Sequence, residues 1–212
     1  MRSTIRIAMA AALAGVALAA LALPAGAAGT NLLKNGGFEK PKLSVGQQSF
    51  SAPHDFGTCV AGSHNCWHLG IGTVDLVKQS VWDPKAGHQS IDLNSGSEAA
   101  EFEQAISITP GSSYKVTFWI AATPGSPDNV ALAVFWGNID EHGNTISAHE
   151  HDYGFAPFGH TATHMGWTKE TFVETADPAA AEVRLYFAST TNLGSGNEDF
   201  GPVVDAVSVK AI

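Results

Sequence analysis

The chain has 212 residues, with 20 acidic and 11 basic side chains and a net charge of −9. This length suits one domain with a sizeable core. A chain with this acidic excess repels phosphate backbones, so the composition disfavours nucleic acid as a partner.

The N-terminus predicts an export signal. Arg2 and Arg6 precede an almost unbroken apolar run, Ile7–Leu23, and residues 25–27 are the small residues that a signal peptidase needs. A transmembrane anchor is the alternative, because the run is close to the shortest spanning length. The small residues and the alanine-rich run favour cleavage.

We therefore expect residues 1–27 to be a signal peptide and residues 28–212 to form a single secreted domain. The leader holds two basic residues and no acidic ones, so the mature chain has 9 basic and 20 acidic residues and a net charge of −11. No second apolar run follows, so we expect no membrane span after cleavage and an extracellular or cell-wall-associated protein.

Two cysteines, Cys59 and Cys66, lie close together in a stretch rich in Gly, Ser and His. In an exported protein such a pair predicts a disulfide that closes a small loop. The alternative is a metal site that includes the neighbouring His64 and His68.

The hydrophobic pattern has a period of two. Phe102–Ile108 and Tyr114–Ile120 both alternate apolar and polar residues, and Pro110-Gly111 lies between them. Two alternating runs around a Pro-Gly turn predict a β-hairpin.

Further short strands are expected along the chain, and turn residues separate nearly all of them, which predicts an all-β sandwich. Two stretches fit poorly as strands, Pro41–His68 and the His-rich insert at about 137–166, so we expect loops and any functional site there. The other strand candidates are Val74–Val77, Ser90–Leu93, Val130–Trp136, Glu170–Glu174, Glu182–Ala188 and Val203–Val209.

Several motifs resemble the bacterial choice-of-anchor C family and the related plant cell-wall proteins with the domain of unknown function numbered 642. The resemblance implies a two-sheet jelly roll of the galactose-binding-like type and an extracellular location. For some relatives it implies binding to cell-wall polysaccharide, and it implies no catalysis. The motifs are Asn31–Glu39, Thr73–Val77, Trp82, Gly87, Gln89–Asn94 and Gly201–Val207.

The resemblance also implies a structural calcium ion where the first strand meets the last. The matching residues are Glu39 and Asp205, whose carboxylates suit a hard cation. Alternatively, Glu39 caps a strand end and Asp205 accepts hydrogen bonds from a turn.

A second candidate metal site is the histidine set His149, His151, His160 and His164. Two histidines two residues apart project the same way on a strand, so His149 and His151 could share a transition metal. Solvated loop histidines, adventitious metal binding and zinc catalysis are the alternatives.

Exposed aromatic rings are candidates for carbohydrate binding, and Trp67, Trp136 and Tyr153 are the residues that we select. Packing in the core is the alternative for each of them. No nucleophile elbow or phosphate loop occurs, so no catalytic residue is assigned.

The sequence as a whole predicts a secreted, non-catalytic binding module for a polysaccharide or cell-surface glycan. A structural or adhesive envelope protein with a protein partner is the alternative, and a metal-dependent hydrolase that uses the histidine insert is a third hypothesis. No organic cofactor is expected, and the sequence does not define an oligomeric state.

Overall fold

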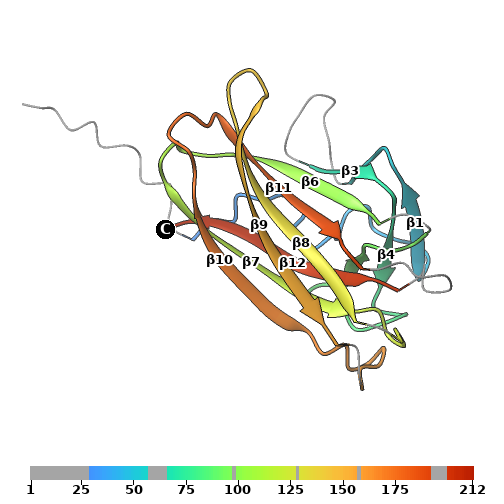
Figure 1. Ribbon diagram of the computed structural model, residues 1–212. Helices are drawn as coiled ribbons and strands as arrows, with labels where there is room; N and C mark the ends of the chain where they lie inside the picture. Colours follow the sequence, from blue (N-terminus) through green and yellow to red (C-terminus); the bar gives the residue numbers. More distant parts are fainter. Residues whose placement is uncertain (1–28, 57–65, 97–98, 128, 157–158, 192–199) are drawn as a thin grey trace, which may run out of the picture.

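The computed structural model describes residues 29–56, 66–96, 99–127, 129–156, 159–191 and 200–212. These residues form two six-stranded antiparallel sheets that pack face to face, as Figure 1 shows, and no described residue lies in a helix. In this part of the chain there is accordingly no helix that could cross a membrane. The all-β, two-sheet jelly roll expected from the sequence is confirmed.

The two sheets take their strands from all parts of the chain. Sheet A has the order β1 (Gln47–Ser51), β4 (Thr73–Lys78), β5 (Gln89–Asp92), β12 (Pro202–Ala211), β7 (Ser113–Ala122) and β10 (Thr168–Thr175). Sheet B has the order β2 (His54–Phe56), β3 (Trp67–Ile71), β6 (Glu101–Ser107), β11 (Glu182–Ser189), β8 (Val130–Ile139) and β9 (Thr145–Phe155).

The expected hairpin across Pro110-Gly111 is wrong, although both of its strands exist. β6 belongs to sheet B and β7 to sheet A, so the connection crosses from one sheet to the other. Phe102 of β6 and Phe118 of β7 are both buried and belong to the same core cluster. A hairpin would have placed the two apolar faces side by side, whereas the crossing makes them face each other.

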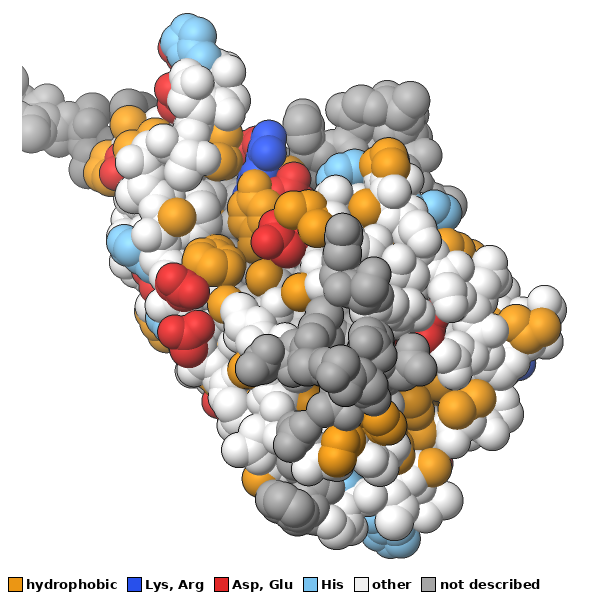
Figure 2. Space-filling model, turned by 45° about the vertical axis from the view of Figure 1, so that its right-hand side comes forward, with side chains coloured by type: hydrophobic (Ala, Val, Ile, Leu, Met, Phe, Trp, Pro, Cys, Tyr) orange, Lys and Arg blue, Asp and Glu red, His pale blue; other side chains and the backbone are white. Residues whose placement is uncertain are grey.

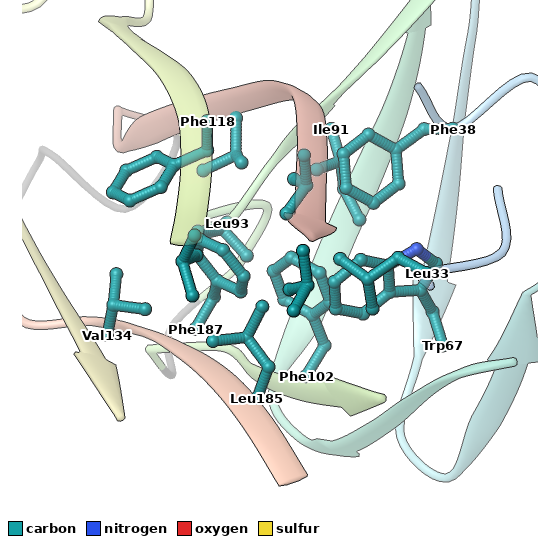
Figure 3. Close-up of a cluster of buried hydrophobic side chains, with 14 of the residues drawn as sticks. Leu33, Phe38, Trp67, Ile91, Leu93, Phe102, Phe118, Val134, Leu185 and Phe187 are labelled. Atoms are coloured by element: carbon teal, nitrogen blue, oxygen red, sulfur yellow. The ribbon is translucent and has the colours of Figure 1, made fainter. Parts of the chain in front are cut away.

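Aromatic rings from both sheets fill the core between them (Figure 3). Phe102 and Phe187 are stacked with ring centroids 5.3 Å apart, and Trp67 lies 4.9 Å from Phe102. Phe118 meets Phe187 edge to face at 5.3 Å. Each ring is at most 1 % exposed, so truncating one of them to alanine would cost about 3–5 kcal/mol.

The opening motif follows β12 without forming a regular strand. The side chain of Asn31 replaces strand pairing, because its amide donates to the Val207 carbonyl and its carbonyl accepts from the Val209 N–H. A Cβ atom on Gly36 would lie 2.1 Å from the Val207 carbonyl oxygen, so only glycine fits there. The opening and closing motifs are therefore in direct contact.

The two stretches expected to be loops contain strands. Pro41–His68 includes β1 and β2 and the start of β3, and the His-rich insert includes the 11 residues of β9. β1, β2 and β9 are edge strands whose residues are mostly exposed or half-buried. Edge strands bury fewer apolar side chains, so their alternation is weak in the sequence.

The outward face of sheet A is partly covered by two connections. Trp82 and Met165 are buried in a second cluster with Val77, Ala121 and Val203, which are outward-facing residues of sheet A. The two connections are joined by hydrogen bonds, since the Asp83 N–H donates to the Ala162 carbonyl at 2.7 Å and the Trp167 indole donates to the Asp83 carbonyl at 3.0 Å. The end of the His-rich insert thus serves as a cover.

Candidate functional site

The outward face of sheet B carries a row of side chains that crosses all six strands. The strand register places these residues next to one another in adjacent strands, about 4.8 Å apart. In order from β2 to β9 the row consists of Asp55, His68, Glu103, Tyr186, Phe135 and Glu150. We call this row and the outward side chains beside it the sheet-B face.

A hollow of about 260 Å³ lies in the sheet-B face. Small residues form its floor, so the rings of Phe135 and Tyr186 stand beside an open space. Figure 2 shows hydrophobic and acidic side chains next to one another on this part of the surface, with a basic group beside them. The hollow is lined by Glu101, Phe135, Gly137, Thr145, Ala148, Tyr186 and Ala188.

The two aromatic rings of the hollow are directly opposite each other in β8 and β11. Both side chains are half-buried, so each ring is supported by the sheet and still has a free surface. A Cβ atom on Gly137 would lie 3.7 Å from the Tyr186 ring, which therefore rests beside the bare backbone of β8. Rigid, half-exposed rings of this kind suit the apolar face of a ligand.

Charged side chains lie beside Tyr186. Arg184 is 3.5 Å from Glu103 and 3.4 Å from Glu182. Burial and the adjacent Glu103 carboxylate raise the pKa of Tyr186, so its hydroxyl stays protonated. Burial opposes the charge on Arg184, but the bond to Tyr186 and the Glu103 carboxylate outweigh it and raise the pKa of the guanidinium.

Two of the three predicted carbohydrate-binding aromatics are in the core, so that prediction is wrong for them. Trp67 and Trp136 are 0 % exposed, and a sugar ring could not reach either indole. Tyr153 is half-buried and meets Phe118 edge to face at 5.2 Å, so its ring packs inward. Burial, with a smaller effect of Glu170, raises the pKa of Tyr153 to about 12.

Phe135 and Tyr186 were not among the predicted binding residues, although the alternation of buried and outward residues marks both positions. Phe135 lies between the buried residues Val134 and Trp136, and Tyr186 lies between Leu185 and Phe187. In a strand with period two, the neighbours of core residues point outward. An aromatic residue at an outward position is a better candidate for binding than one at an inward position.

His149 and His151 project the same way from β9, as expected, but they meet a carboxylate. His149 Nδ1 is 2.7 Å from one oxygen of Glu174, and His151 Nε2 is 2.8 Å from the other. His151 also stacks on Phe172, with centroids 4.0 Å apart. Because Glu174 belongs to β10, these contacts join the edges of the two sheets.

The other two histidines lie in the connection after β9. His164 forms an isolated bridge with Thr161, and the ring of His160 packs against Gly166. Within the described ranges no three His, Cys, Asp or Glu side chains form a group that could hold a metal ion. The candidate transition-metal site that combines these histidines is therefore not formed by this part of the chain.

Glu39 and Asp205 converge on one turn, residues 85–89. Glu39 accepts hydrogen bonds from the N–H groups of His88 and Gln89, at 2.6 and 3.1 Å. Asp205 accepts from the N–H groups of Ala86 and Ala206, at 2.9 and 2.6 Å. Burial raises the pKa of Asp205 to about 7, and the nearby Glu39 carboxylate adds to this rise.

The polar groups aimed at these two carboxylates are N–H donors, which suit an anion and not a cation. This geometry is the hydrogen-bonding alternative of the sequence analysis, and it satisfies Glu39 and Asp205 without an ion. The two side chains alone do not provide the six to eight oxygens that calcium takes. Calcium binding stays a prediction.

Two further predictions concern residues outside the described ranges. Cys59 lies there, so the disulfide between Cys59 and Cys66 stays a prediction. The same holds for the signal peptide at residues 1–27 and for the domain boundary that follows it.

The family model described as "Protein of unknown function (DUF642)" matches residues 31–210. The chain belongs to the DUF642 family. This confirms the resemblance seen in the opening, middle and closing motifs. No match was found among curated proteins.

Solved structures similar to this DUF642 protein include two carbohydrate-binding modules. One is the CBM22-1 xylan-binding domain from Paenibacillus barcinonensis Xyn10C, at 15 % identity and a TM-score of 0.50, covering 78 % of this chain and 93 % of that one. The other is TmCBM61 in complex with β-1,4-galactotriose, at 15 % identity and a TM-score of 0.50, covering 86 % and 99 %.

A third similar structure is the enzymatically active domain of tailspike protein 4 from bacteriophage CBA120. The identity is 19 % and the TM-score is 0.50, over 86 % of this chain but only 21 % of the tailspike chain. The DUF642 protein thus spans about a fifth of the tailspike chain and nearly the whole of both binding modules. At these identities the likeness establishes the fold.

Proposed function

We propose that this DUF642 protein is an exported, non-catalytic module that binds a polysaccharide on its sheet-B face. One observation carries the proposal: Phe135 and Tyr186 are neighbouring, half-exposed rings beside a hollow in an otherwise polar face. Ligand sites in proteins combine such apolar surfaces with a few polar groups that fix orientation.

The chemistry of the face suits a sugar chain. Each pyranose ring presents a flat face of C–H groups, which packs on an aromatic ring, and a rim of hydroxyl groups, which needs hydrogen-bond partners. Carboxylates accept hydrogen bonds from hydroxyls and the guanidinium donates to them. Glu103, Arg184 and Glu150 lie within one strand of the two rings and can fill these roles.

Two further observations support the proposal. A xylan-binding domain and a module that holds a galactotriose share the fold, so this sandwich is compatible with glycan binding. The predicted signal peptide would bring the protein to the compartment where such polymers occur.

A pull-down with insoluble polysaccharides, together with a soluble glycan array, tests the proposal. We expect the wild-type chain to bind at least one polymer, and we expect Phe135→Ala and Tyr186→Ala to lose that binding. Val173→Ala is the matched control, since Val173 is 54 % exposed on β10 in the other sheet. An equal loss of glycan binding in Val173→Ala would show that binding does not depend on the sheet-B face. Capture of a protein and no glycan would favour the adhesive alternative.

A further inference from the structure

We propose that the sheet-B face selects glycans that carry protonated amino groups, such as glucosamine polymers, over neutral and uronic-acid glycans. This inference rests on the proposed function, because it assigns the class of sugar to the same hollow. It is carried by the charges that surround the two aromatic rings.

Carboxylates dominate the described part of the sheet-B face. Arg184 is the cation that accompanies them, and His68, 2.7 Å from Asp55, is a further partner when protonated. The register of the strands places the carboxylates on both sides of the Tyr186–Phe135 pair. The acidic residues of the face are Asp55, Glu101, Glu103, Glu150, Asp152 and Glu182.

The one guanidinium already has partners within the protein. Arg184 lies against Glu103 and Glu182, so it neutralises part of their charge and has little left for an anionic ligand. Glu101, Glu150 and Asp152 are exposed residues. A ligand that enters the hollow therefore meets the exposed Glu101, which lines it, and lies near Glu150, which is paired with Phe135.

Each aromatic ring has a carboxylate directly beside it. Glu150 is the register partner of Phe135 in β9, and Glu103 is the register partner of Tyr186 in β6. Side chains at such paired positions start about 5 Å apart at their Cβ atoms. Glu103 is half-buried and paired with Arg184, whereas Glu150 is exposed, so a sugar stacked on Phe135 would hold its ring substituents within reach of the Glu150 carboxylate.

The charge of the substituent decides how strongly it binds there. An ammonium group forms charge-assisted hydrogen bonds to carboxylates, which are roughly twice as strong as those of a neutral group. A uronate is repelled by the same carboxylates. Salt weakens this attraction, because exposed charges are screened over about 10 Å at 0.1 M ionic strength.

Calorimetric titration with a matched set of hexasaccharides tests the inference. The hexamers of glucose, N-acetylglucosamine and glucosamine share one β-1,4-linked backbone, and a galacturonate hexamer supplies the anionic case. We expect the glucosamine hexamer to bind roughly tenfold or more tightly than the glucose hexamer at low salt, with the ratio falling as salt rises.

Glu150→Gln should lower the affinity for the glucosamine hexamer more than that for the glucose hexamer and so reduce this ratio, because the amide keeps an acceptor oxygen for hydroxyls but has no charge for an ammonium group. Glu141→Gln is the matched control, because Glu141 is an exposed residue of the β8–β9 turn outside the sheet-B face. Both substitutions affect exposed side chains, and circular dichroism will confirm that the variants fold.

The outcomes separate this inference from the proposed function. Equal binding of the glucose and glucosamine hexamers, or tighter binding of galacturonate, overturns the charge preference and leaves the glycan-binding module in place. Binding of no hexamer and no insoluble polymer overturns both.

Discussion

The outward faces of the two sheets differ in what covers them. Sheet A is covered in its middle by Trp82, Met165 and Trp167, which pack on outward-facing Val77 and Val203. Sheet B has no comparable cover among the described residues, and its outward rings border a hollow. Apolar side chains on sheet A thus complete a second core, whereas Phe135 and Tyr186 on sheet B remain half-exposed.

Paired hydroxyl groups occupy part of the remaining outward face of sheet A. Beyond the covered part, β7 and β10 pair hydroxyl groups across the strands, Ser113 with Thr175 and Thr117 with Thr171. These hydroxyl groups satisfy one another. We therefore propose that the outward face of sheet A contributes stability and that the outward face of sheet B serves recognition.

The largest effect is expected when the cover of sheet A is removed. Trp82 is 6 % exposed and its indole donates to the Ser90 hydroxyl at 2.8 Å. Trp82→Ala should lower the free energy of unfolding by about 3–5 kcal/mol, measured by urea denaturation. Glycan affinity of the remaining folded protein should not change, and a specific loss of affinity would contradict the division between the faces.

A second large effect concerns the pH dependence of stability at Asp205. Burial raises the pKa of Asp205 in the folded state to about 7, whereas in the unfolded chain it is near 3.8. Between these values the unfolded chain ionises and the folded chain keeps its proton. The protonated Asp205 carboxyl therefore makes its full contribution to stability below about pH 4. This contribution, on the order of 4 kcal/mol, is lost as the pH rises to about 7.

Asp205→Asn removes this titration, so the difference in unfolding free energy between variant and wild type should move in favour of the variant as pH rises from 4 to 7. Asp83→Asn is the control, because Asp83 is an exposed residue of the neighbouring connection. Parallel stability profiles for wild type and Asp205→Asn would show that the buried carboxyl does not retain its proton.

Filling the hollow should abolish binding with little effect on the fold. A Cβ on Gly137 meets only ordinary contacts, 3.6 Å to the Arg184 carbonyl oxygen and 3.7 Å to the Tyr186 ring. Gly137→Leu should therefore place its side chain in the hollow and weaken glycan binding at least about tenfold, or about 1.4 kcal/mol. Gly154→Leu is the control, as Gly154 lies on β9 outside the hollow with open space around it. Unchanged glycan affinity in Gly137→Leu would contradict ligand binding in the hollow.

A smaller effect is expected where the sheet edges meet. Glu174→Gln removes the carboxylate that His149 and His151 share. Because these pairs are partly exposed, the loss of stability should be about 1 kcal/mol or less. A double-mutant cycle between Glu174 and His151 measures the coupling, and a value near zero would mean that the contacts do not hold the edges together.

The smallest effect is expected from calcium. The N–H donors at Glu39 and Asp205 already satisfy these carboxylates, so a chelator should leave the melting temperature unchanged. An occupied site would stabilise by about 2.7 kcal/mol at one hundred times its Kd. A rise in melting temperature with added calcium would contradict this expectation and support the calcium ion that the family resemblance implies.

The sequence predicted the architecture well because period-two alternation depends on burial in the sandwich. It failed for strand pairing at β6 and β7, since alternation indicates which side chains are buried but not which sheet a strand joins. It also missed the edge strands β1, β2 and β9, whose residues are mostly exposed or half-buried.

The candidate site was harder to predict for a related reason. Trp67 begins β3 and Trp136 lies within β8, and only their inward position in the pleat shows that they belong to the core. Phe135 follows the buried Val134 directly, and no property of its residue type distinguishes it from its neighbours. The hollow depends on Gly137, Ala148 and Ala188, which three strands bring together, and this arrangement requires the strand order.

Chemical-shift mapping by NMR with the tightest-binding hexasaccharide tests the central claim most directly. We predict that the largest ligand-induced changes in amide chemical shift occur in β6, β11, β8 and β9 around Tyr186 and Phe135. The amide shifts of β7, β10 and β12 should change little. Shifts concentrated on the outward face of sheet A, or in the cover around Trp82, would contradict the assignment of recognition to sheet B.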